Sequence, residues 1–269
     1  MLSYSVLSKP VANCQRISFQ ALTRLAEGDA APETLHRLRT NLRRLQAYLE
    51  LIGNEADAGL VGRCVSKLSP LRTLHVFHQH LLRTGAPKED LGKVQVLVQH
   101  ARGRLLERKA YKKIERQLWS IVFPLIPGDQ DWLLNRLEVL RQVHLNDLEQ
   151  LLQAVLEKPR RKRLHALRLK VKTIRYQEEW LHARGGSHAH FLKRLKGVQK
   201  RLGRYEELAE FRKLAKTLDL DSSPLILKEW RRARKRARTL PQQLGWMVET
   251  LLATRLHDGT ERPHGRMVV

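Results

Sequence analysis

The sequence predicts an all-α fold made of two four-helix bundles in tandem, and three observations support this prediction. Apolar residues recur at three- and four-residue steps in nearly every long segment, which is the periodicity of an amphipathic helix. Segments of alternating polar and apolar residues, typical of strands, are close to absent. The order of the helical segments also repeats once, about half-way along the chain.

The helical periodicity is clear between residues 35 and 52. One helical face there collects Leu35, Leu38, Leu42, Leu45, Leu49 and Ile52. Clusters of glycine, proline and serine separate such segments, at residues 28–32, 53–59, 85–87, 124–128, 159, 185–187 and 222–224. These breaks divide the chain into about eight helices.

The repeat is carried by two similar segments, LHRLRTNLRRL from Leu35 and LHALRLKVKTIRY from Leu164. Their histidines, His36 and His165, are 129 residues apart, and each segment is preceded by one predicted helix and followed by two. A period this long indicates duplication of a small domain rather than a solenoid. We therefore expect one four-helix half over residues 1–126, a second over residues 127–256, and a polar, poorly ordered tail over residues 257–269.

The charge of the chain points to a polyanionic partner. Lysine and arginine number 51 against 27 acidic residues, a formal net charge of +24. Folding brings these like charges together at an electrostatic cost that a bound polyanion would relieve. DNA, RNA, anionic lipid and inorganic polyanions all fit this observation, and so does a helical protein with simply basic solvated faces.

Location and redox state follow from what the sequence lacks. The first ten residues have no continuous apolar core typical of a signal peptide, and no stretch has the length of a membrane span. The two cysteines, Cys14 and Cys64, have neither metal-ligand nor redox spacing. We therefore expect a cytoplasmic protein with reduced cysteines and no membrane partner.

Two basic stripes run beside the leucine faces of the repeated segments. The first basic stripe is His36, Arg39 and Arg43, whose spacing keeps them within about 60° of the helix circumference. The second basic stripe has the same offsets and one more member: His165, Arg168, Lys172 and Arg175. Residues beside an apolar stripe lie at the margin of a core, where their charged ends can converge with those of a neighbouring helix.

Other predicted helices carry basic residues at helical spacing as well. These candidates are Arg63 and Lys67 after the first stripe, Arg108 further on, Lys193, Lys196 and Lys200 after the second stripe, and Arg231 and Lys235 in the last helix. Each such stripe taken singly is equally consistent with a solvated face. Their recurrence at matching places in both halves favours a shared binding role.

The two histidines allow more than one role. Metal ligation is disfavoured because the neighbouring positions on both helices are cationic, so we predict neither a metal nor a cofactor. Each ring could instead donate a hydrogen bond to phosphate or satisfy a buried backbone carbonyl. In the first case, mild acid should tighten anion binding.

A histidine followed by basic residues at +3 and +7 in both halves, and at +10 in the second half, where the first has Gln46 instead of the basic Arg175, resembles the pattern of the CHAD family, the conserved histidine α-helical domain. Leu202, Gly203 and Glu207 look like a second family element, whereas the first half has Leu68, Ser69 and Thr73 there. The resemblance covers nearly the whole chain. It implies two four-helix bundles related by pseudo-twofold symmetry, with a basic groove at their junction that binds inorganic polyphosphate.

The resemblance also implies site residues and partners. The family's phosphate-binding pattern is matched by His36, Arg39, Arg43, His165, Arg168, Lys172 and Arg175, and looser basic positions are matched by Lys67, Lys193 and Lys200. Family members often occur near polyphosphate enzymes or on polyphosphate granules. The resemblance therefore implies granule association, or a separate polyphosphate-metabolising enzyme as partner.

The residue inventory favours polyphosphate over two other ligand or activity classes. Single-strand nucleic-acid binders present aromatic side chains on which bases stack, and the basic stripes contain almost none. Phosphoryl-transfer enzymes need carboxylates for metal ions or a glycine-rich phosphate loop, and the stripes lack both. The predicted function is therefore a non-catalytic polyphosphate-binding module, and the alternative is a general polyanion-binding protein that takes nucleic acid.

Overall fold

The computed structural model describes residues 5–107, 109–121, 130–182 and 189–258. Within these ranges the chain forms helices and no strands, which confirms the all-α prediction. The helices are α1 (Ser5–Ala26), α2 (Pro32–Leu51), α3 (Glu55–Arg83), α4 (Lys88–Glu107), α5 (Ala110–Trp119), α6 (Gln130–Glu157), α7 (Arg161–His182), α8 (Ala189–Thr217) and α9 (Ser223–Asp258). None of these described helices is long and apolar enough to cross a membrane.

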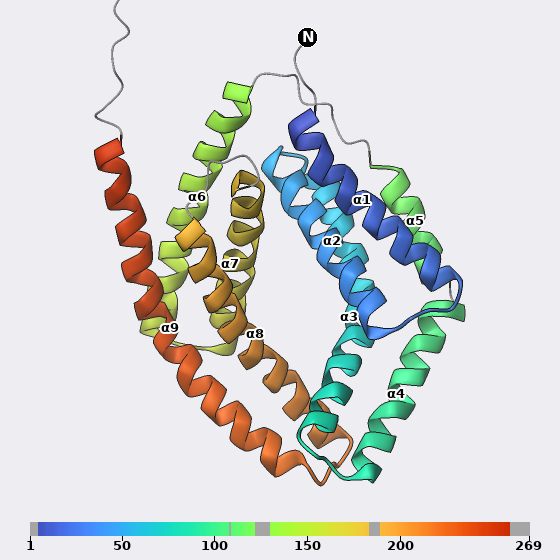
Figure 1. Ribbon diagram of the computed structural model, residues 1–269. Helices are drawn as coiled ribbons and strands as arrows, with labels where there is room; N and C mark the ends of the chain where they lie inside the picture. The colour runs from blue at the N-terminus through green and yellow to red at the C-terminus, as the bar shows by residue number, and fades with distance from the viewer. Residues whose placement is uncertain (1–4, 108, 122–129, 183–188, 259–269) are drawn as a thin grey trace, which may run out of the picture.

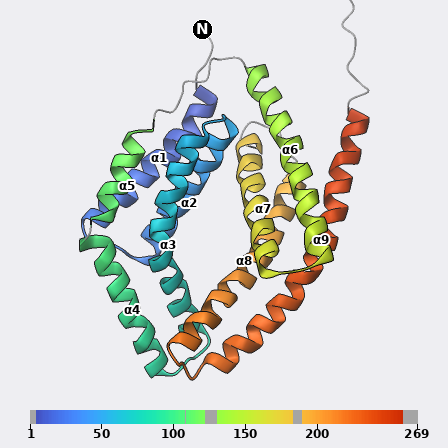
Figure 2. The ribbon, with the colours of Figure 1, turned by 180° about the vertical axis from the view of Figure 1, so that it is seen from behind.

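The helices form two groups, α1 to α5 on one side and α6 to α9 on the other (Figures 1 and 2). Between them, α2 and α7 occupy the interior and face each other, while α4 and α9 lie at opposite outer edges. The helix expected to end the first half is divided into α4 and α5, because Lys109 adopts a left-handed backbone with φ of 45°. Arg108 and the predicted break at residues 124–128 lie outside the described residues, and so does the tail beyond Asp258.

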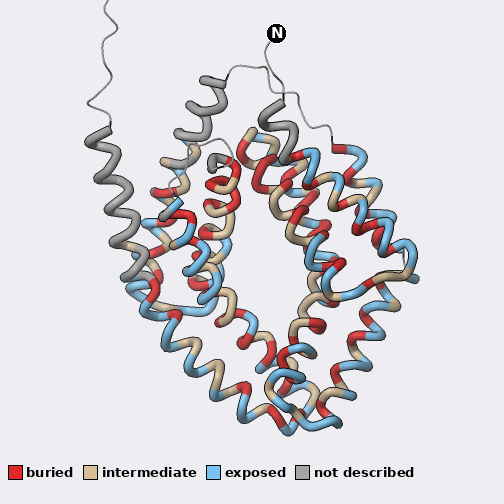
Figure 3. Tube along the Cα trace, in the orientation of Figure 1, coloured by how far each residue is buried: buried red, intermediate tan, exposed pale blue. Residues whose placement is uncertain are grey.

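Two clusters of buried apolar residues form the core. The second cluster belongs to α6, α7, the first part of α8 and α9. The first cluster is built mainly on α1 to α5, but it also contains Leu208, Phe211 and Ala215 from the last part of α8. Figure 3 shows that buried residues extend to the lower meeting point of the two groups. The first core cluster therefore extends across the two expected halves. The predicted boundary at residue 126 stays a prediction.

The lower junction is held by both apolar and polar contacts. Phe77 of α3 stacks on Phe211 of α8, with ring centres 4.9 Å apart. The buried carboxylate of Asp90 on α4 accepts hydrogen bonds from the backbone N–H and the hydroxyl of Ser222, at 2.9 and 2.6 Å. Burial alone would raise the pKa of Asp90, but these hydrogen bonds outweigh it and lower that pKa. The ends of α3, α4, α8 and α9 are thereby fixed together.

Candidate functional site

The two predicted basic stripes meet at one cavity between the helix groups. The cavity has a volume of about 970 Å³ and is lined by α2, α3, α7 and α8. We call it the junction cavity. Its lining residues are His36, Arg39, Thr40, Arg43, Ser69, Arg72, Thr73, Val76, Arg161, Lys162, His165, Arg168, Leu169, Lys172, Tyr176, Gln199, Glu206, Glu207, Glu210 and Phe211. Six of the residues predicted from sequence, three from each stripe, are among them.

The leucine faces explain why the stripes converge. On α2, Leu35, Leu38 and Leu42 are fully buried and turn toward the first core cluster. On α7, Leu164 and Leu167 are buried in the second core cluster. Each basic stripe lies beside its apolar face, so burying the two faces in different clusters leaves both stripes facing the space between α2 and α7.

Three cations of the junction cavity have neither an acidic partner nor a hydrogen bond to another described residue, whereas Arg43 and Arg72, which also lack an acidic partner, donate to neutral oxygens. Within the described residues, no carboxylate lies within ion-pair distance of Arg39, Arg168 or Lys172. The Nε of Arg168 is buried and has no hydrogen-bond partner in the protein. Buried donors are normally paired, so these groups could bind an anion from outside the chain.

The pKa values of the cavity cations reflect their burial first and their mutual repulsion second. Burial, together with the neighbouring Arg43, Arg72 and Arg168, lowers the pKa of Arg39 to about 10. Burial and the surrounding arginines lower the pKa of Lys172 further, to about 7. Both shifts mean that the empty cavity disfavours positive charge, and a bound anion would reverse this. The free energy of anion binding would therefore include the relief of repulsion between these cations.

Arg72 joins this cationic group although sequence analysis did not select it. It projects from α3 into the junction cavity and donates a long hydrogen bond to the Pro32 carbonyl, at 3.4 Å. Burial lowers its pKa as well. The signal was present, because Ser69, Arg72 and Val76 follow at steps of three and four on one face of α3.

One end of the junction cavity is acidic. Glu206 and Glu210 of α8 both accept hydrogen bonds from Arg161, the former at 3.2 Å. Glu206 also lies 3.5 Å from Nδ1 of His165. Arg161 was not predicted as a site residue, because the repeated pattern begins at His165. It lies one turn earlier on the same face of α7. At this end, the protein neutralises its own charge.

A smaller cavity of about 140 Å³ continues the site in the other direction along α2 and α7. It shares Arg43, Lys172 and Tyr176 with the junction cavity. Nη1 of Arg43 donates to Gln46 at 2.7 Å, and Gln46 donates in turn to Glu50 at 2.9 Å. Burial raises the pKa of Glu50, so this carboxylate holds its negative charge less readily than an exposed one.

The fourth member of the second stripe supports the wall of the site rather than lining it. Arg175 donates to Gln199 of α8 at 2.6 Å and forms an ion pair with Glu179. Its guanidinium lies 4.1 Å from the ring centre of Tyr176, on which it stacks. Arg175 therefore holds α7 against α8 and covers one of the two aromatic rings of the cavity.

The remaining predicted residues lie elsewhere. Lys67 of α3 contacts Gln117 of α5 at 3.3 Å, and neither it nor the exposed Arg63 lines the cavity. On α8, Lys193, Lys196 and Lys200 are exposed outside the cavity, with Lys196 at 3.8 Å from Glu179. Arg231 and Lys235 are exposed on α9. None of these residues lines the junction cavity, so any contact of theirs with a ligand would lie outside it.

Both stripe histidines lie at the edge of the junction cavity. In the described part of the chain, no group of three or more histidine, cysteine or acidic side chains is placed to hold a metal ion. His36 and His165 are both exposed and border the junction cavity. Burial of part of the ring and the nearby Arg72 lower the pKa of His36. A hydrogen bond from either ring to a ligand in the cavity stays a prediction.

Comparison with known proteins agrees with this architecture. Residues 15–216, well over half of the chain, match the family model described as the CHAD domain. The chain belongs to the CHAD domain family. No curated protein matches the chain.

Two solved structures share the CHAD fold seen here. The CHAD domain from the plant Ricinus communis superposes with a TM-score of 0.60 at 20% sequence identity, covering 93% of this chain and 90% of that one. PptA from Streptomyces chartreusis superposes with a TM-score of 0.59 at 14% identity, covering 93% of this chain and 100% of that one. At these identities the likeness concerns the fold alone.

Proposed function

We propose that this CHAD protein binds inorganic polyphosphate in the junction cavity without transforming it. The observation that carries the proposal is the convergence of five cations, Arg39, Arg43, Arg72, Arg168 and Lys172, on one cavity. None of the five has a carboxylate within ion-pair distance among the described residues. A ligand made only of phosphates needs arginine forks and lysine point charges, which is what these residues supply.

Polyphosphate fits the cavity better than a nucleic acid does. Single-strand binders offer aromatic faces on which bases stack. The junction cavity has two aromatic side chains, Tyr176 and Phe211. Arg175 and Lys172 lie over the ring of Tyr176, Phe77 stacks on Phe211, and both aromatic side chains are buried, so neither ring presents an exposed face. A base entering the cavity would have no free platform.

The acids of the cavity support a binding role rather than a catalytic one. Glu206 and Glu210 are both engaged by Arg161, so two of the three carboxylates are already paired with a cation. Phosphoryl transfer needs carboxylates free to hold metal ions against the phosphates. The module thus delivers or retains polyphosphate, and a separate polyphosphate-metabolising enzyme or a polyphosphate granule is its proposed partner.

The test is a binding measurement on the purified protein with long-chain polyphosphate at about 0.15 M salt, with tripolyphosphate and duplex DNA as competitors. We expect tight binding that long polyphosphate displaces and that DNA displaces poorly. Several phosphate contacts release counterions, so the logarithm of the affinity should fall with that of salt concentration at a slope of about −3 to −5.

Two results would overturn the proposal. Equal displacement by DNA and polyphosphate at matched phosphate concentration would make the cavity part of a general polyanion surface. Binding that is unchanged when Arg39 and Arg168 are both replaced by glutamine would place the ligand outside the junction cavity. As a matched control, Lys112 and Arg116 on α5 are exposed, and replacing both by glutamine removes the same charge far from the cavity.

A further inference from the structure

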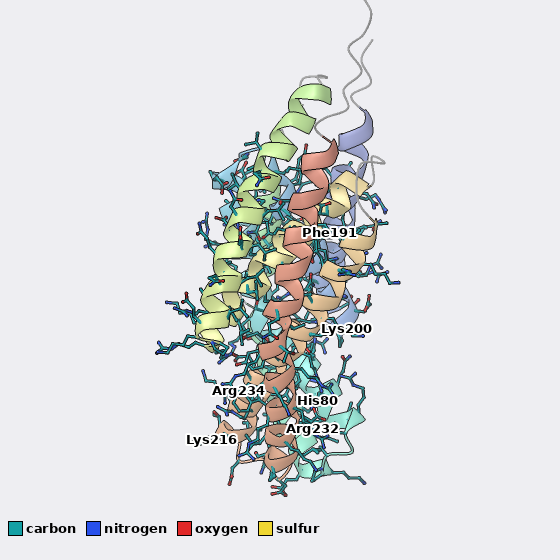
Figure 4. The ribbon with its side chains drawn as sticks, turned by 90° about the vertical axis from the view of Figure 1, so that its left-hand side faces the viewer. His80, Phe191, Lys200, Lys216, Arg232 and Arg234 are labelled. Atoms are coloured by element: carbon teal, nitrogen blue, oxygen red, sulfur yellow. The ribbon has the colours of Figure 1, made fainter. Side chains whose placement is uncertain are left out.

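A second concentration of positive charge lies on α9. Between residues 228 and 238 the helix has seven cations and a single acid, Glu229. Six of these cations are exposed on one side of the helix and form what we call the α9 outer face: Lys228, Arg231, Arg232, Lys235, Arg236 and Arg238. Figure 4 turns this side toward the viewer, with α9 in front and Arg232 and Arg234 labelled on its lower part.

Internal neutralisation does not explain the α9 outer face. None of its six cations has a carboxylate within ion-pair distance among the described residues. The one nearby acid, Glu229, turns inward, where it pairs with Arg204 at 2.8 Å and with His80 at 3.3 Å. Like charges at steps of three and four destabilise a helix by a few tenths of a kcal/mol per pair. The face is thus maintained at a cost to folding.

The inner side of α9 holds this face in a fixed orientation. Ala237 and Leu240 are buried in the second core cluster, and Ile226 in the first. Trp230 lies between two guanidinium groups, with Arg212 4.1 Å and Arg234 5.3 Å from its ring centre. Because the scaffold is already ordered, little backbone entropy is lost when the face meets a partner.

The α9 outer face is separate from the junction cavity. No residue of α9 lines that cavity, which is built by α2, α3, α7 and α8. The helix packs on α8 and α6, at the outer edge of the molecule, while α2 and α7 lie inside it (Figure 1). The segment of a phosphate chain that is held in the junction cavity therefore leaves the α9 outer face free for another segment.

We propose that the α9 outer face binds a second segment of a phosphate polymer, so that one protein molecule joins two polyphosphate segments. This inference rests on the proposed function of the junction cavity. The cavity encloses one segment, whereas the convex helix offers exposed arginine and lysine ends to another by charge alone. Joining segments in this way would gather polyphosphate into larger assemblies.

The test measures bridging directly. Two samples of long-chain polyphosphate, one with a donor dye and one with an acceptor dye, are mixed with limiting full-length protein, and energy transfer between the dyes is recorded. We expect transfer with the wild type. The variant with Arg232→Gln, Lys235→Gln and Arg236→Gln should lose at least about fivefold of it, because three phosphate contacts disappear. Its binding of tripolyphosphate in the junction cavity should change by less than about twofold.

A matched control removes the same charge at another exposed place. Lys112→Gln, Lys113→Gln and Arg116→Gln together take three cations from α5, and this variant should bridge as well as the wild type. The inference is overturned if the α9 variant bridges as well as the α5 control does. Self-association of the protein, which could join the chains without the α9 outer face, would give this result. Equal loss in both variants also overturns it, because net charge alone would then decide.

Two further measurements identify the ligand and distinguish failure of the inference from failure of the proposed function. Replacing one labelled polyphosphate by labelled duplex DNA tests the source of phosphate: bridging of DNA to polyphosphate without bridging of two polyphosphates would overturn the choice of ligand. Equal energy transfer with the two ligand combinations supports a face that binds phosphate groups through their charge. Arg168→Gln should abolish tripolyphosphate binding as well as bridging, and if tripolyphosphate binding persists there, the proposed function fails rather than the inference.

Discussion

The two walls of the junction cavity differ although they come from repeated segments. Aligning Leu68 of α3 with Leu202 of α8, as the repeat suggests, places Arg72 opposite Glu206 in sequence. Arg72 adds a cation to the cavity, whereas Glu206 pairs with Arg161 and approaches His165. The α3 wall therefore raises the positive potential of the site, and the α8 wall reduces it at one end.

This difference shows how two segments of similar sequence can build an asymmetric site. The positions that build the helices are retained in both halves, because burial of leucines on α2 and α7 constrains them. Positions that border the cavity carry no packing constraint, so their charge can change without loss of the fold. The result is one site with a strongly cationic centre and an acidic end, rather than two equal sites.

The largest effect on binding is expected at the centre, where the two walls meet. Arg168→Glu should weaken polyphosphate binding by about 100-fold, because it removes an unpaired cation and adds repulsion next to the remaining ones. Helicity measured by circular dichroism should be unchanged, since Arg168 makes no ion pair in the described structure. Loss of helicity would show instead that the second basic stripe is structural.

The sharpest test of the comparison changes one residue on each wall. Arg72→Ala should weaken binding by about tenfold, since it removes one charge-assisted contact. Glu206→Gln should strengthen it by a few-fold, because His165 loses its acidic partner and Arg161 keeps only Glu210. Titration calorimetry with the same polyphosphate measures the affinity of both variants. If both weaken binding, the acidic wall contributes to the site and the comparison fails.

The pH dependence of binding should follow Lys172. With its pKa at about 7 in the empty cavity, this amine is largely protonated at pH 6 and largely neutral at pH 8. Binding must then take up a proton at the higher pH, so affinity should fall by up to about tenfold from pH 6 to pH 8. In the empty protein, stability should instead rise as pH increases from about 7 to 10, because the unfolded chain holds this proton longer.

Lys172→Arg is the control for that pH dependence. An arginine stays charged over this range, so the fall in affinity should flatten to what the two histidines contribute. His36→Gln and His165→Gln measure that remainder. A pH profile identical in the wild type and in Lys172→Arg would exclude the lysine as its source.

The smallest effect is expected on the outer side of α3. Arg63→Gln combined with Lys67→Gln should change polyphosphate affinity by less than about twofold, because both side chains are exposed and neither borders the cavity. The same charge loss at the cavity would be far more costly, so the pair calibrates the effect of net charge. A tenfold loss here would extend the binding surface beyond the junction cavity.

The sequence alone was sufficient for the helices and for the two stripes. A three- and four-residue period is a local property, so the apolar face of α2 and the basic stripe beside it could be predicted together. The spacing of His36, Arg39 and Arg43, repeated at His165, Arg168 and Lys172, places them on single helical faces in any tertiary arrangement. These six residues do line one cavity.

Only the tertiary structure decided which of the other cations share that cavity. Lys67 and Arg72 lie on the same helix, yet one contacts α5 and the other enters the site. That choice depends on which helices pack on each side of α3, a property of contacts between residues far apart in sequence. The same reason separates Arg231 and Lys235 from the cavity: α9 packs with its apolar side inward, which leaves their charges on the opposite surface.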